Sequence, residues 1–489
     1  LIAQEQSLSI YKNGGFWDLC EGPHVDSTRD IPKNCFCLDH LAGAYWKGSE
    51  KNKMMQRVYG LAFETSEELK QYQDNLILAM ERDHRKLNNK HNYFKISEEI
   101  GKGLPLWLPN GTVIRDELEK LAKEKEFIAG YKRVATPHIT REKIFQTSGH
   151  LPYYKDSMFP PMEIDGERIF LKPMNCPHHH MIYRSEQRSY RDLPLRLAEY
   201  GTCYRYEQSG ELAGLLRVRC MNMNDAHIYC SPDQAKDEFV SVMKMHAEYY
   251  RLFGLKDFWM RLSLSEEDAD KYVDEPILWK KAEMLVIEAM DEVEIPYESV
   301  RGEAAFYGPK IDFQVTNVVG REETASTNQL DLVMGKRFGL TYIGSDNSEH
   351  TPMIIHRAPL GTHERFTAFL IEHYGGVFPT WLAPIQLLLI PVAPVFNEYA
   401  NKLKDILIKS FVRTEIDSSN DSFSKKIRLA AISKIPNIII LGEKEQKDQK
   451  VTWQRYGSKE RQILDFDSFL KLLNEEILER KDWRLSENP

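Results

Sequence analysis

Cysteine and histidine residues occur at three places along the chain that could hold a metal ion. Cys176 precedes the histidine triplet 178–180, His227 follows an aspartate by two positions, and His356 precedes an arginine. A zinc site takes three or four nitrogen or sulfur ligands, and a catalytic site leaves one position open. Adjacent side chains seldom converge on one ion, so we expect packing or surface roles for most of the triplet. Spacing alone leaves Cys176, His227 and His356 as three unconnected candidates.

Arginines close to glycines form a second candidate site. Arg205, Arg217 and Arg365 lie in three separate loop-like stretches. Guanidinium groups hold phosphate oxygens through two parallel hydrogen bonds, so this spread suits a triphosphate clamped from several sides. Taken singly, each arginine could equally be a surface ion-pair residue. The sequence contains neither a P-loop nor a GxGxxG fingerprint, so a bound nucleotide would use another fold.

A tight turn with a phenol and an ammonium group is the third feature. It runs over residues 305–310 and carries Tyr307 and Lys310 into a following apolar stretch. Taken alone, this turn assigns no function.

Helical and strand periodicities predict the elements that must position these residues. Apolar residues at helical spacing predict one long helix over 66–89 that joins domains. The block 93–383 mixes helix and strand signals with loops of unequal length, which favours an α+β fold with an antiparallel sheet. The predicted helices there are 113–127, 232–253 and 276–290, and the predicted strands are 168–172, 311–318 and 353–356.

A proline-rich stretch over 378–384 marks a domain boundary. Beyond it, continuous apolar strands alternate regularly with helices, which indicates a parallel or mixed sheet covered on both faces. We therefore predict a multidomain chain that combines α+β and α/β architecture. Its predicted segments are residues 1–62, the linker helix 63–92, a central domain over 93–383 and a C-terminal domain over 384–489.

Composition limits the class of protein. With 42% hydrophobic and 28% charged residues, the 489-residue chain can bury more than one core. The seven cysteines lack framework spacing, which indicates a reducing compartment, and we expect the cytoplasm. No apolar run reaches the roughly 20 residues of a membrane span, and we expect no membrane partner. The net charge of −8 does not itself favour a nucleic-acid partner. Because the chain starts mid-pattern with Leu1, we take it to be cut on its N-terminal side.

Several long strings together resemble the threonyl-tRNA synthetase family of class II aminoacyl-tRNA synthetases. The match runs from about Phe16 to the last helix and implies a class II antiparallel catalytic domain followed by a mixed-sheet anticodon-binding domain. The strings are KPMNCP (172–177), SYRDLPLRLAEYG (189–201), YRYEQSGEL (204–212), LLRVRC (215–220), DAHI (225–228), FYGPKIDF (306–313), QLDL (329–332), IIHRAPLGTHERF (354–366) and FPTWLAP (378–384).

The resemblance implies roles for the arginine loops. Arg205 and Glu207 match motif 2, where the arginine holds the α-phosphate of ATP and the glutamate reads the adenine amino group. Arg217 falls among the ATP-binding residues, and Arg365 matches the motif 3 arginine on the terminal phosphates. Pro137 lies in a stretch resembling motif 1, which implies a homodimer formed through the catalytic domain.

The resemblance also implies one zinc ion per subunit, with Cys176, His227 and His356 as ligands. Threonine and valine are nearly isosteric, so an apolar pocket separates them poorly. An open coordination position separates them, because the amino and hydroxyl groups of threonine both bind the metal. The implied threonine-binding residues are Asp225, which would accept from the substrate hydroxyl, and Tyr307, Lys310 and Gln329.

The implied activity is that of a threonine–tRNA ligase. ATP with Mg²⁺ activates L-threonine to threonyl-adenylate, and the amino acid then passes to the 3′ end of tRNA(Thr). Three alternatives compete with this interpretation: a class II synthetase of other specificity, such as the prolyl or glycyl type, a non-catalytic RNA-binding relative, and a metal-dependent hydrolase built on the histidines.

The ends of the chain carry two further expectations. Cys20 and His24 resemble half of the family's editing site, whose other half, an upstream HxxxH pair, is absent from this sequence; we therefore expect no effective editing of seryl-tRNA. In the C-terminal domain, the candidate anticodon contacts are Asn420, Lys426, Arg428 and Arg455.

The sequence departs from the family near the proposed pocket. His178 stands where a glycine is usual, Met223 replaces a glutamine and Asn224 replaces an acidic residue. These changes affect pocket geometry and leave the proposed ligands and arginines intact.

Overall fold

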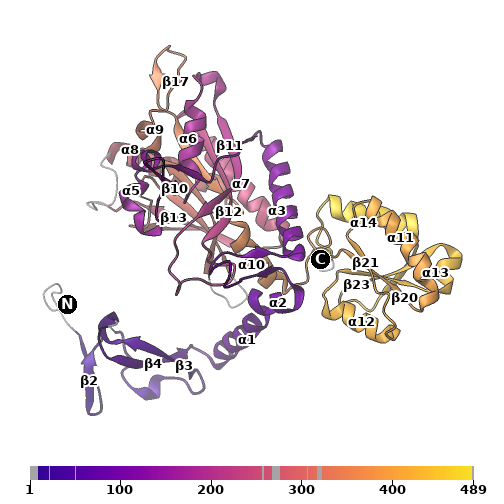
Figure 1. Ribbon diagram of the computed structural model, residues 1–489. Helices are drawn as coiled ribbons and strands as arrows, with labels where there is room; N and C mark the ends of the chain where they lie inside the picture. The colour runs from indigo at the N-terminus through magenta and orange to yellow at the C-terminus, as the bar shows by residue number, and fades with distance from the viewer. Residues whose placement is uncertain are drawn as a thin grey trace. The chain divides into compact units, whose positions relative to one another are not determined.

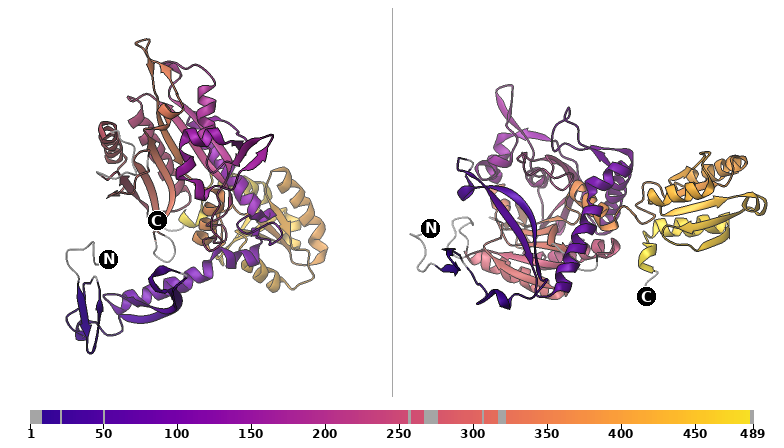
Figure 2. Two further views of the ribbon diagram at one scale, coloured as in Figure 1. Left: turned by 60° about the vertical axis from the view of Figure 1, so that its left-hand side comes forward. Right: turned by 90° about the horizontal axis from the view of Figure 1, so that it is seen from below.

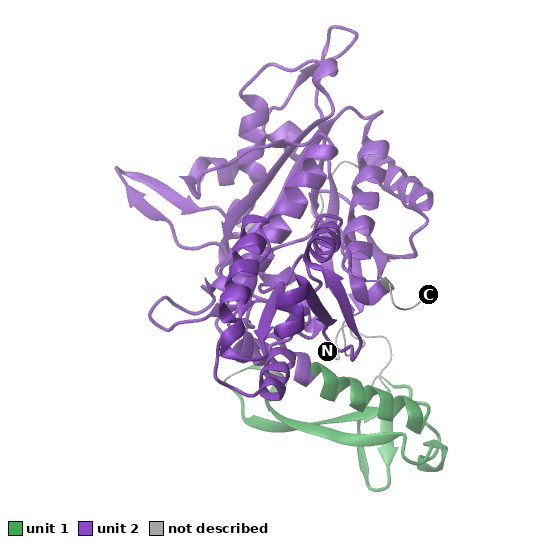
Figure 3. Cartoon of the chain, turned by 90° about the vertical axis from the view of Figure 1, so that its right-hand side faces the viewer, with its two compact units in different colours: residues 1–79 green, residues 80–489 purple. Residues whose placement is uncertain are grey.

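The computed structural model describes residues 9–20, 22–49, 51–255, 258–266, 276–305, 307–316 and 322–486. The chain divides into two compact units, residues 1–79 and 80–489 (Figure 3). Parts of several predictions lie outside the described residues. They are residues 1–8, 21 and 50 of the first segment, residues 256–257, 267–275 and 317–321 of the central domain, Phe306 of the predicted turn, residues 317–318 of a predicted strand and residues 487–489 of the C-terminal domain.

The first unit contains two antiparallel hairpins. Strand β1 (Ile10–Asn13) pairs with β2 (Phe16–Leu19), and β3 (Phe36–Tyr45) pairs with β4 (Met54–Ala62). Helix α1 (Ser66–Arg82) follows them.

The prediction of a single helix over 66–89 is wrong. The backbone leaves the helical conformation at Asp83, where φ is −47° and ψ is 124°. The Asp83 carboxylate accepts a hydrogen bond from the Arg85 amide and starts a new helix, α2 (His84–His91). An aspartate is a strong N-cap because its oxygen satisfies a free amide of the first turn. The apolar periodicity continues through this break and therefore does not reveal it.

An eight-stranded sheet is the centre of the second unit (Figure 1). Its inner pairs are antiparallel and the outermost pair at each edge is parallel, which confirms the predicted antiparallel sheet. In spatial order the strands are β14 (Tyr297–Arg301), β13 (Phe258–Leu264), β15 (Lys310–Thr316), β16 (Glu322–Asp331), β19 (Met353–Ala358), β12 (Cys220–Cys230), β11 (Leu195–Tyr204) and β7 (Lys132–Arg133).

Alternating residues of these strands pack on opposite faces of the sheet. Ala226 and Ile355 belong to the large core beneath the long helices, which are α3 (Pro109–Ile128), α7 (Ala235–Leu252), α8 (Pro276–Val293) and α10 (His363–Tyr374). Leu197 and Tyr229 pack on the other face, against α6 (Cys176–Arg184) and α9 (Met334–Arg337). These two shorter helices leave part of that face open to a cavity.

Short elements complete the part of the second unit that contains the eight-stranded sheet. They are β5 (Phe94–Lys95), β6 (Leu106–Trp107), β8 (Ile139–Arg141), α4 (Glu142–Ser148), α5 (His150–Tyr153), β9 (Met162–Ile164), β10 (Glu167–Leu171), β17 (Tyr342–Ile343) and β18 (Glu349–His350).

The C-terminal segment forms a second sheet with helices on both faces (Figures 1 and 2). The strand order is β21 (Thr414–Ile416), β20 (Leu387–Pro391), β22 (Asn437–Leu441), β23 (Lys450–Arg455) and β24 (Arg461–Asp465). The first three strands are parallel and the last two are antiparallel, which confirms the predicted mixed sheet. Helices α11 (Asn397–Lys409) and α14 (Phe466–Leu478) cover one face and α12 (Phe423–Ile432) covers the other; α13 (Glu443–Asp448) and α15 (Trp483–Ser486) are short.

All seven cysteines are free thiols. Among the described helices, none combines the length and the apolar character needed to cross a bilayer.

Candidate active site and metal-binding cluster

Strand register places four of the predicted residues in one row. His227 lies opposite His356, His356 lies opposite Gln329, and Gln329 lies opposite Lys310. Directly opposed residues of antiparallel strands point to the same face of a sheet. Asp225 precedes His227 by two positions and therefore faces the same side. Side chains that are distant along the chain thus line one surface.

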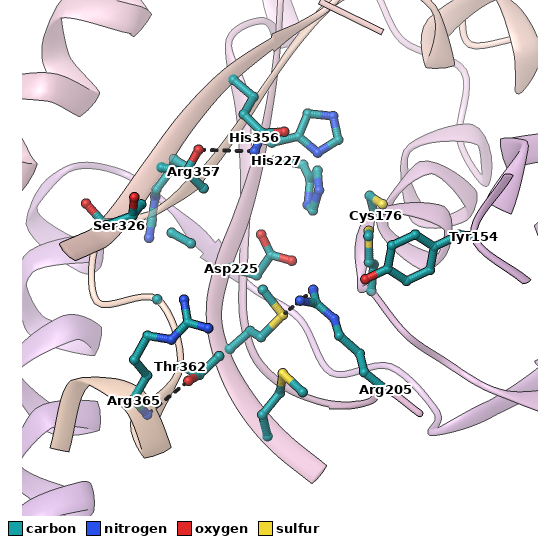
Figure 4. Close-up of a pocket in the computed structure, with 18 of the residues that line it drawn as sticks. Tyr154, Cys176, Arg205, Asp225, His227, Ser326, His356, Arg357, Thr362 and Arg365 are labelled. Carbon is teal, nitrogen blue, oxygen red and sulfur yellow. Dashed lines mark hydrogen bonds between the residues drawn. The ribbon is translucent and has the colours of Figure 1, made fainter. Parts of the chain in front are cut away.

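Cys176, the first residue of α6, lies beside His227 and His356 (Figure 4). One ligand atom from each of Cys176, His227 and His356 lies within 4.8 Å of the others. The structure therefore brings together the three residues that sequence spacing left unconnected.

The chemistry of these three residues fits a zinc ion. The His227 Nε2 atom is buried and lacks a hydrogen-bond partner among the described residues, as a metal ligand would in the absence of its ion. Burial lowers the pKa of His227 well below its usual value, so the ring is neutral and has a free lone pair. Burial, together with Asp225 and Asp331, raises the pKa of the Cys176 thiol. A zinc ion would offset that effect, because a coordinating thiol loses its proton.

The histidine triplet surrounds the cluster through different contacts. The His179 Nδ1 atom lies 2.8 Å from His227 Nδ1, and His180 Nδ1 lies 2.9 Å from the Tyr229 hydroxyl. Both ring nitrogens of His178 are buried without a partner among the described residues. His180 also forms a possible metal-binding group with Asp331 and His356, although the Nε2 atom of His356 is already 2.8 Å from the Asp331 carboxylate.

A cavity of about 460 Å³ opens beside the cluster (Figure 4). This volume lies within the range of small-molecule sites. The predicted site residues that line it are Cys176, Arg205, Glu207, Arg217, Asp225, His227, Tyr307, Gln329, His356 and Arg365. Lys310 is not among the lining residues, and its ammonium group donates to the Asp312 carboxylate at 2.7 Å.

The end of the cavity beside Cys176, His227 and His356 is polar. Asp225 is 8% exposed and accepts a hydrogen bond of 3.2 Å from the Asn175 amide. Burial raises the pKa of Asp225. The Tyr307 hydroxyl donates to the Gln329 side-chain oxygen. These groups offer hydrogen-bond acceptors and a donor beside the metal cluster.

Three arginines make the other end of the cavity positive. Arg365 donates to the Leu216 carbonyl at 3.2 Å, and Arg205 donates to the Pro173 carbonyl at 3.3 Å. Burial and the charges of Arg205 and Arg217 lower the pKa of Arg365. Arg217 is 3.5 Å from the Glu211 carboxylate and 3.9 Å from the Glu207 carboxylate. Arg205 and Arg365 make their hydrogen bonds to backbone carbonyls instead, and cations that converge in this way can hold an anion.

The two substitutions in the pocket strand have different consequences. The Met223 sulfur lines the cavity and lies 3.8 Å from an Arg205 terminal nitrogen. Asn224 points to the opposite face, where its amide donates to Glu126 at 2.9 Å. The change at 223 therefore alters the cavity, whereas the change at 224 alters the core.

Sequence reasoning missed the carboxylates behind the histidine ligands. Asp331 contacts His356 directly, and Glu199 lies 3.1 Å from His179, which in turn contacts His227. The sequence could have predicted Asp331, because the QLDL string places it two residues after Gln329 and therefore on the same face of the strand. Glu199 carries no such signal, because its approach depends on α6 packing on the sheet.

The end-of-chain candidates occupy contrasting settings. In the first unit, Cys20 Sγ lies 3.1 Å from His24 Nε2, and both residues are exposed. In the C-terminal domain, Arg428 is exposed, and Asn420 is an exposed loop residue.

The other two anticodon candidates are held by internal contacts. Lys426 is 4% exposed and donates to the Asp417 and Pro391 carbonyls. Arg455 pairs with Glu476 at 2.5 Å.

Comparisons with known proteins agree with this architecture. Residues 161–374 match the model of the tRNA synthetase class II core domain (G, H, P, S and T). Residues 386–476 match the anticodon binding domain, and residues 8–59 match the threonyl and alanyl tRNA synthetase second additional domain.

Curated relatives cover nearly the whole chain. A threonine–tRNA ligase of Geobacillus sp. is 48% identical over 97% of this chain and 74% of its own length. One from Deinococcus radiodurans is 48% identical over 98% of this chain and 74% of its own length.

Solved structures show the same fold. The RNA binding domain of threonyl-tRNA synthetase from Cryptosporidium parvum superposes with a TM-score of 0.77 and 32% identity, covering 81% of this chain and 98% of that one. A putative threonyl-tRNA synthetase from Aeropyrum pernix gives a TM-score of 0.72 and 27% identity, covering 82% and 96%.

Proposed function

This chain belongs to the threonine–tRNA ligase family of class II synthetases, and from that premise we propose that its cavity binds L-threonine beside a zinc ion and ATP beside three arginines. The enzyme joins threonine to tRNA in two steps. The threonine carboxylate attacks the α-phosphate of ATP with Mg²⁺, which gives threonyl-adenylate and pyrophosphate. A 3′-terminal ribose hydroxyl of the tRNA then attacks the carbonyl carbon and releases AMP.

Cys176, His227 and His356 would hold one zinc ion per subunit. When bound, an open zinc site would coordinate the amino and hydroxyl groups of threonine and so discriminate against valine. Asp225 would accept from the substrate hydroxyl, and Tyr307 with Gln329 would orient the amino acid. Lys310 would contact the amino acid after its ion pair with Asp312 breaks, or would act indirectly by holding Asp312 in place.

The arginines would neutralise the phosphates. Arg205 would hold the α-phosphate, Arg365 would hold the terminal phosphates, and Glu207 would read the adenine amino group. Arg217 would also contact ATP. The support is that all three arginines line the same cavity; burial, together with the charges of Arg205 and Arg217, lowers the pKa of Arg365. Catalysis would come mainly from in-line positioning and charge stabilisation in the transition state.

We propose the following roles for the four segments. Residues 1–62 would be part of an editing domain, 63–92 a linker, 93–383 the catalytic domain and 384–489 the anticodon-binding domain. Cys20 and His24 would be half of an editing site, and their 3.1 Å contact supports a paired role. Asn420 and Arg428 would contact the anticodon, while Lys426 and Arg455 would hold the shape of that surface.

We also propose a homodimer formed through the catalytic domain. Pro137 is exposed, and at the end of α3 Phe127 and Ile128 are each 82% exposed. A partner that covered such apolar side chains would gain free energy from burying them. The free thiols agree with a cytoplasmic location, where cysteines stay reduced.

The observation that carries this proposal is the meeting of a cysteine and two histidines at one end of a cavity whose other end holds three arginines. ATP–pyrophosphate exchange with threonine, serine and valine, before and after removal of metal, tests it. We expect exchange with threonine, a little with serine, almost none with valine, and loss of exchange after metal removal that zinc restores. Full exchange after complete metal removal would contradict the zinc role.

A further inference from the structure

Glu199 is a buried carboxylate surrounded by donors. It is 5% exposed, and its oxygens lie 2.8 Å from the Thr136 amide nitrogen, 2.8 Å from the Thr136 hydroxyl and 3.1 Å from His179 Nε2. The fully buried ammonium group of Lys172 lies 3.6 Å away. Burial alone would raise the pKa of Glu199, but the contacts with His179, Lys172 and Thr136 outweigh it and lower the pKa to about 2. Glu199 therefore only accepts hydrogen bonds.

The direction of each hydrogen bond follows from that acceptor. Because Glu199 accepts, His179 Nε2 carries the proton and donates it. Because Lys172 lies close enough to balance the carboxylate charge, we take His179 as a neutral imidazole, which carries a proton on one nitrogen only. His179 Nδ1 is then an acceptor, so His227 Nδ1, at 2.8 Å, must be the donor. That leaves a lone pair on His227 Nε2, the buried atom without a partner among the described residues.

We propose that Glu199 and His179 are positioning residues that fix the tautomer of His227, so that its Nε2 lone pair faces the metal. This inference rests on the proposed zinc site. His356 is held in a comparable way, because its Nε2 atom lies 2.8 Å from Asp331, a carboxylate that also accepts the amides of Val333 and Met334. Outer partners of this kind orient a ligand and raise its basicity.

The two hydrogen bonds from His227 to His179 and from His179 to Glu199 are called the relay below. Glu199→Gln tests their direction. A carboxamide at 199 can donate to His179 Nε2, which moves the His179 proton to Nδ1 and forces His227 to carry its proton on Nε2. We expect zinc affinity to fall by about 10- to 100-fold, the usual effect of losing such a partner. His179→Phe removes the relay without reversing it, so we expect a smaller loss.

The matched control is Glu238→Gln. Glu238 is 6% exposed and pairs with Arg196. Arg196 lies on the same strand as Glu199, but neither member of this pair contacts His179 or His227. Zinc affinity of the full chain is measured by competition with a chromophoric chelator. The visible absorption of bound Co²⁺ reports the coordination geometry, and the metal-free melting temperature reports the fold.

The outcomes separate the relay from the zinc site. We expect Glu199→Gln to weaken zinc binding and change the Co²⁺ spectrum, and Glu238→Gln to do neither at a similar melting temperature. Unchanged zinc binding in Glu199→Gln, while Cys176→Ser abolishes it, would overturn the relay and keep the site. Wild-type zinc binding in Cys176→Ser would overturn the proposed site itself. If Glu199→Gln does not fold, unchanged zinc affinity in His179→Phe overturns the relay.

Discussion

His227 and His356 face each other across strands β12 and β19, with ring centroids 4.5 Å apart. They are separated by more than a hundred residues of sequence, and a single hydrogen-bonded register aligns them. Cys176 reaches the same point from the start of α6.

Cys176→Ser should remove the metal and the exchange activity together. A serine hydroxyl is a much poorer zinc ligand than a thiolate, and the two histidines alone do not complete a site. Metal content and ATP–pyrophosphate exchange with threonine measure the two effects. Cys230→Ser is the control, because Cys230 is a buried thiol on the His227 strand that belongs to the core under the long helices. A Cys176→Ser protein with full zinc content would contradict the assignment.

Arg365→Gln should slow exchange without unfolding the protein. If Arg365 stabilises charge in the transition state, its loss lowers kcat by about 100-fold or more, whereas the KM for threonine changes little. Steady-state exchange at varied ATP and threonine separates the two constants. Arg168→Gln serves for comparison, since Arg168 forms a partly exposed pair with Glu142 that does not line the cavity. Equal rates in both variants would remove Arg365 from the phosphate site.

Asn224 and Asp225 are neighbours, but substitution of Asn224 should change stability whereas substitution of Asp225 should change activity. Asn224→Ala removes a buried hydrogen bond to Glu126 and should lower stability by about 1–3 kcal/mol, with threonine still preferred over valine. Asp225→Asn should instead reduce exchange with threonine, because its carboxylate lines the cavity. Melting curves and exchange ratios for the two variants test the strand alternation directly. A change of amino-acid preference in Asn224→Ala would contradict it.

Because of His363, the protein should become less stable at acidic pH. Burial lowers its pKa from 6.5 to about 4, although Glu119 opposes that shift. The unfolded chain therefore binds a proton that the folded chain does not, and stability falls as the pH drops from about 6.5 towards 4. Between pH 7 and pH 5, protonation of this one group in the unfolded chain lowers the free energy of unfolding by about 2 kcal/mol.

Melting temperatures at pH 7 and pH 5 measure that loss. His363→Gln should lose less stability on acidification than the unchanged protein. His138→Gln, which alters an exposed ring, should match the unchanged protein. The same pH dependence in His363→Gln and the unchanged protein would show that His363 does not titrate in this way.

Sequence patterns were enough to identify the family, the class of fold and ten of the residues that line the cavity. Long strings such as KPMNCP carry that information because they are local and specific. Regular apolar periodicity likewise sufficed for the mixed C-terminal sheet, since helices and strands bury faces at fixed spacings. Local periodicity failed at Asp83, where one capping contact ended a helix that the apolar pattern continued.

Tertiary structure alone decided which of these residues meet. Strand register aligned His227 with His356, and the packing of α6 on the sheet brought His179 between His227 and Glu199. It also turned Asn224 into the core and drew Lys426 beneath the surface. Such contacts form between segments that are distant in the chain. The spacing of residues along one segment does not show which other segment it will pack against.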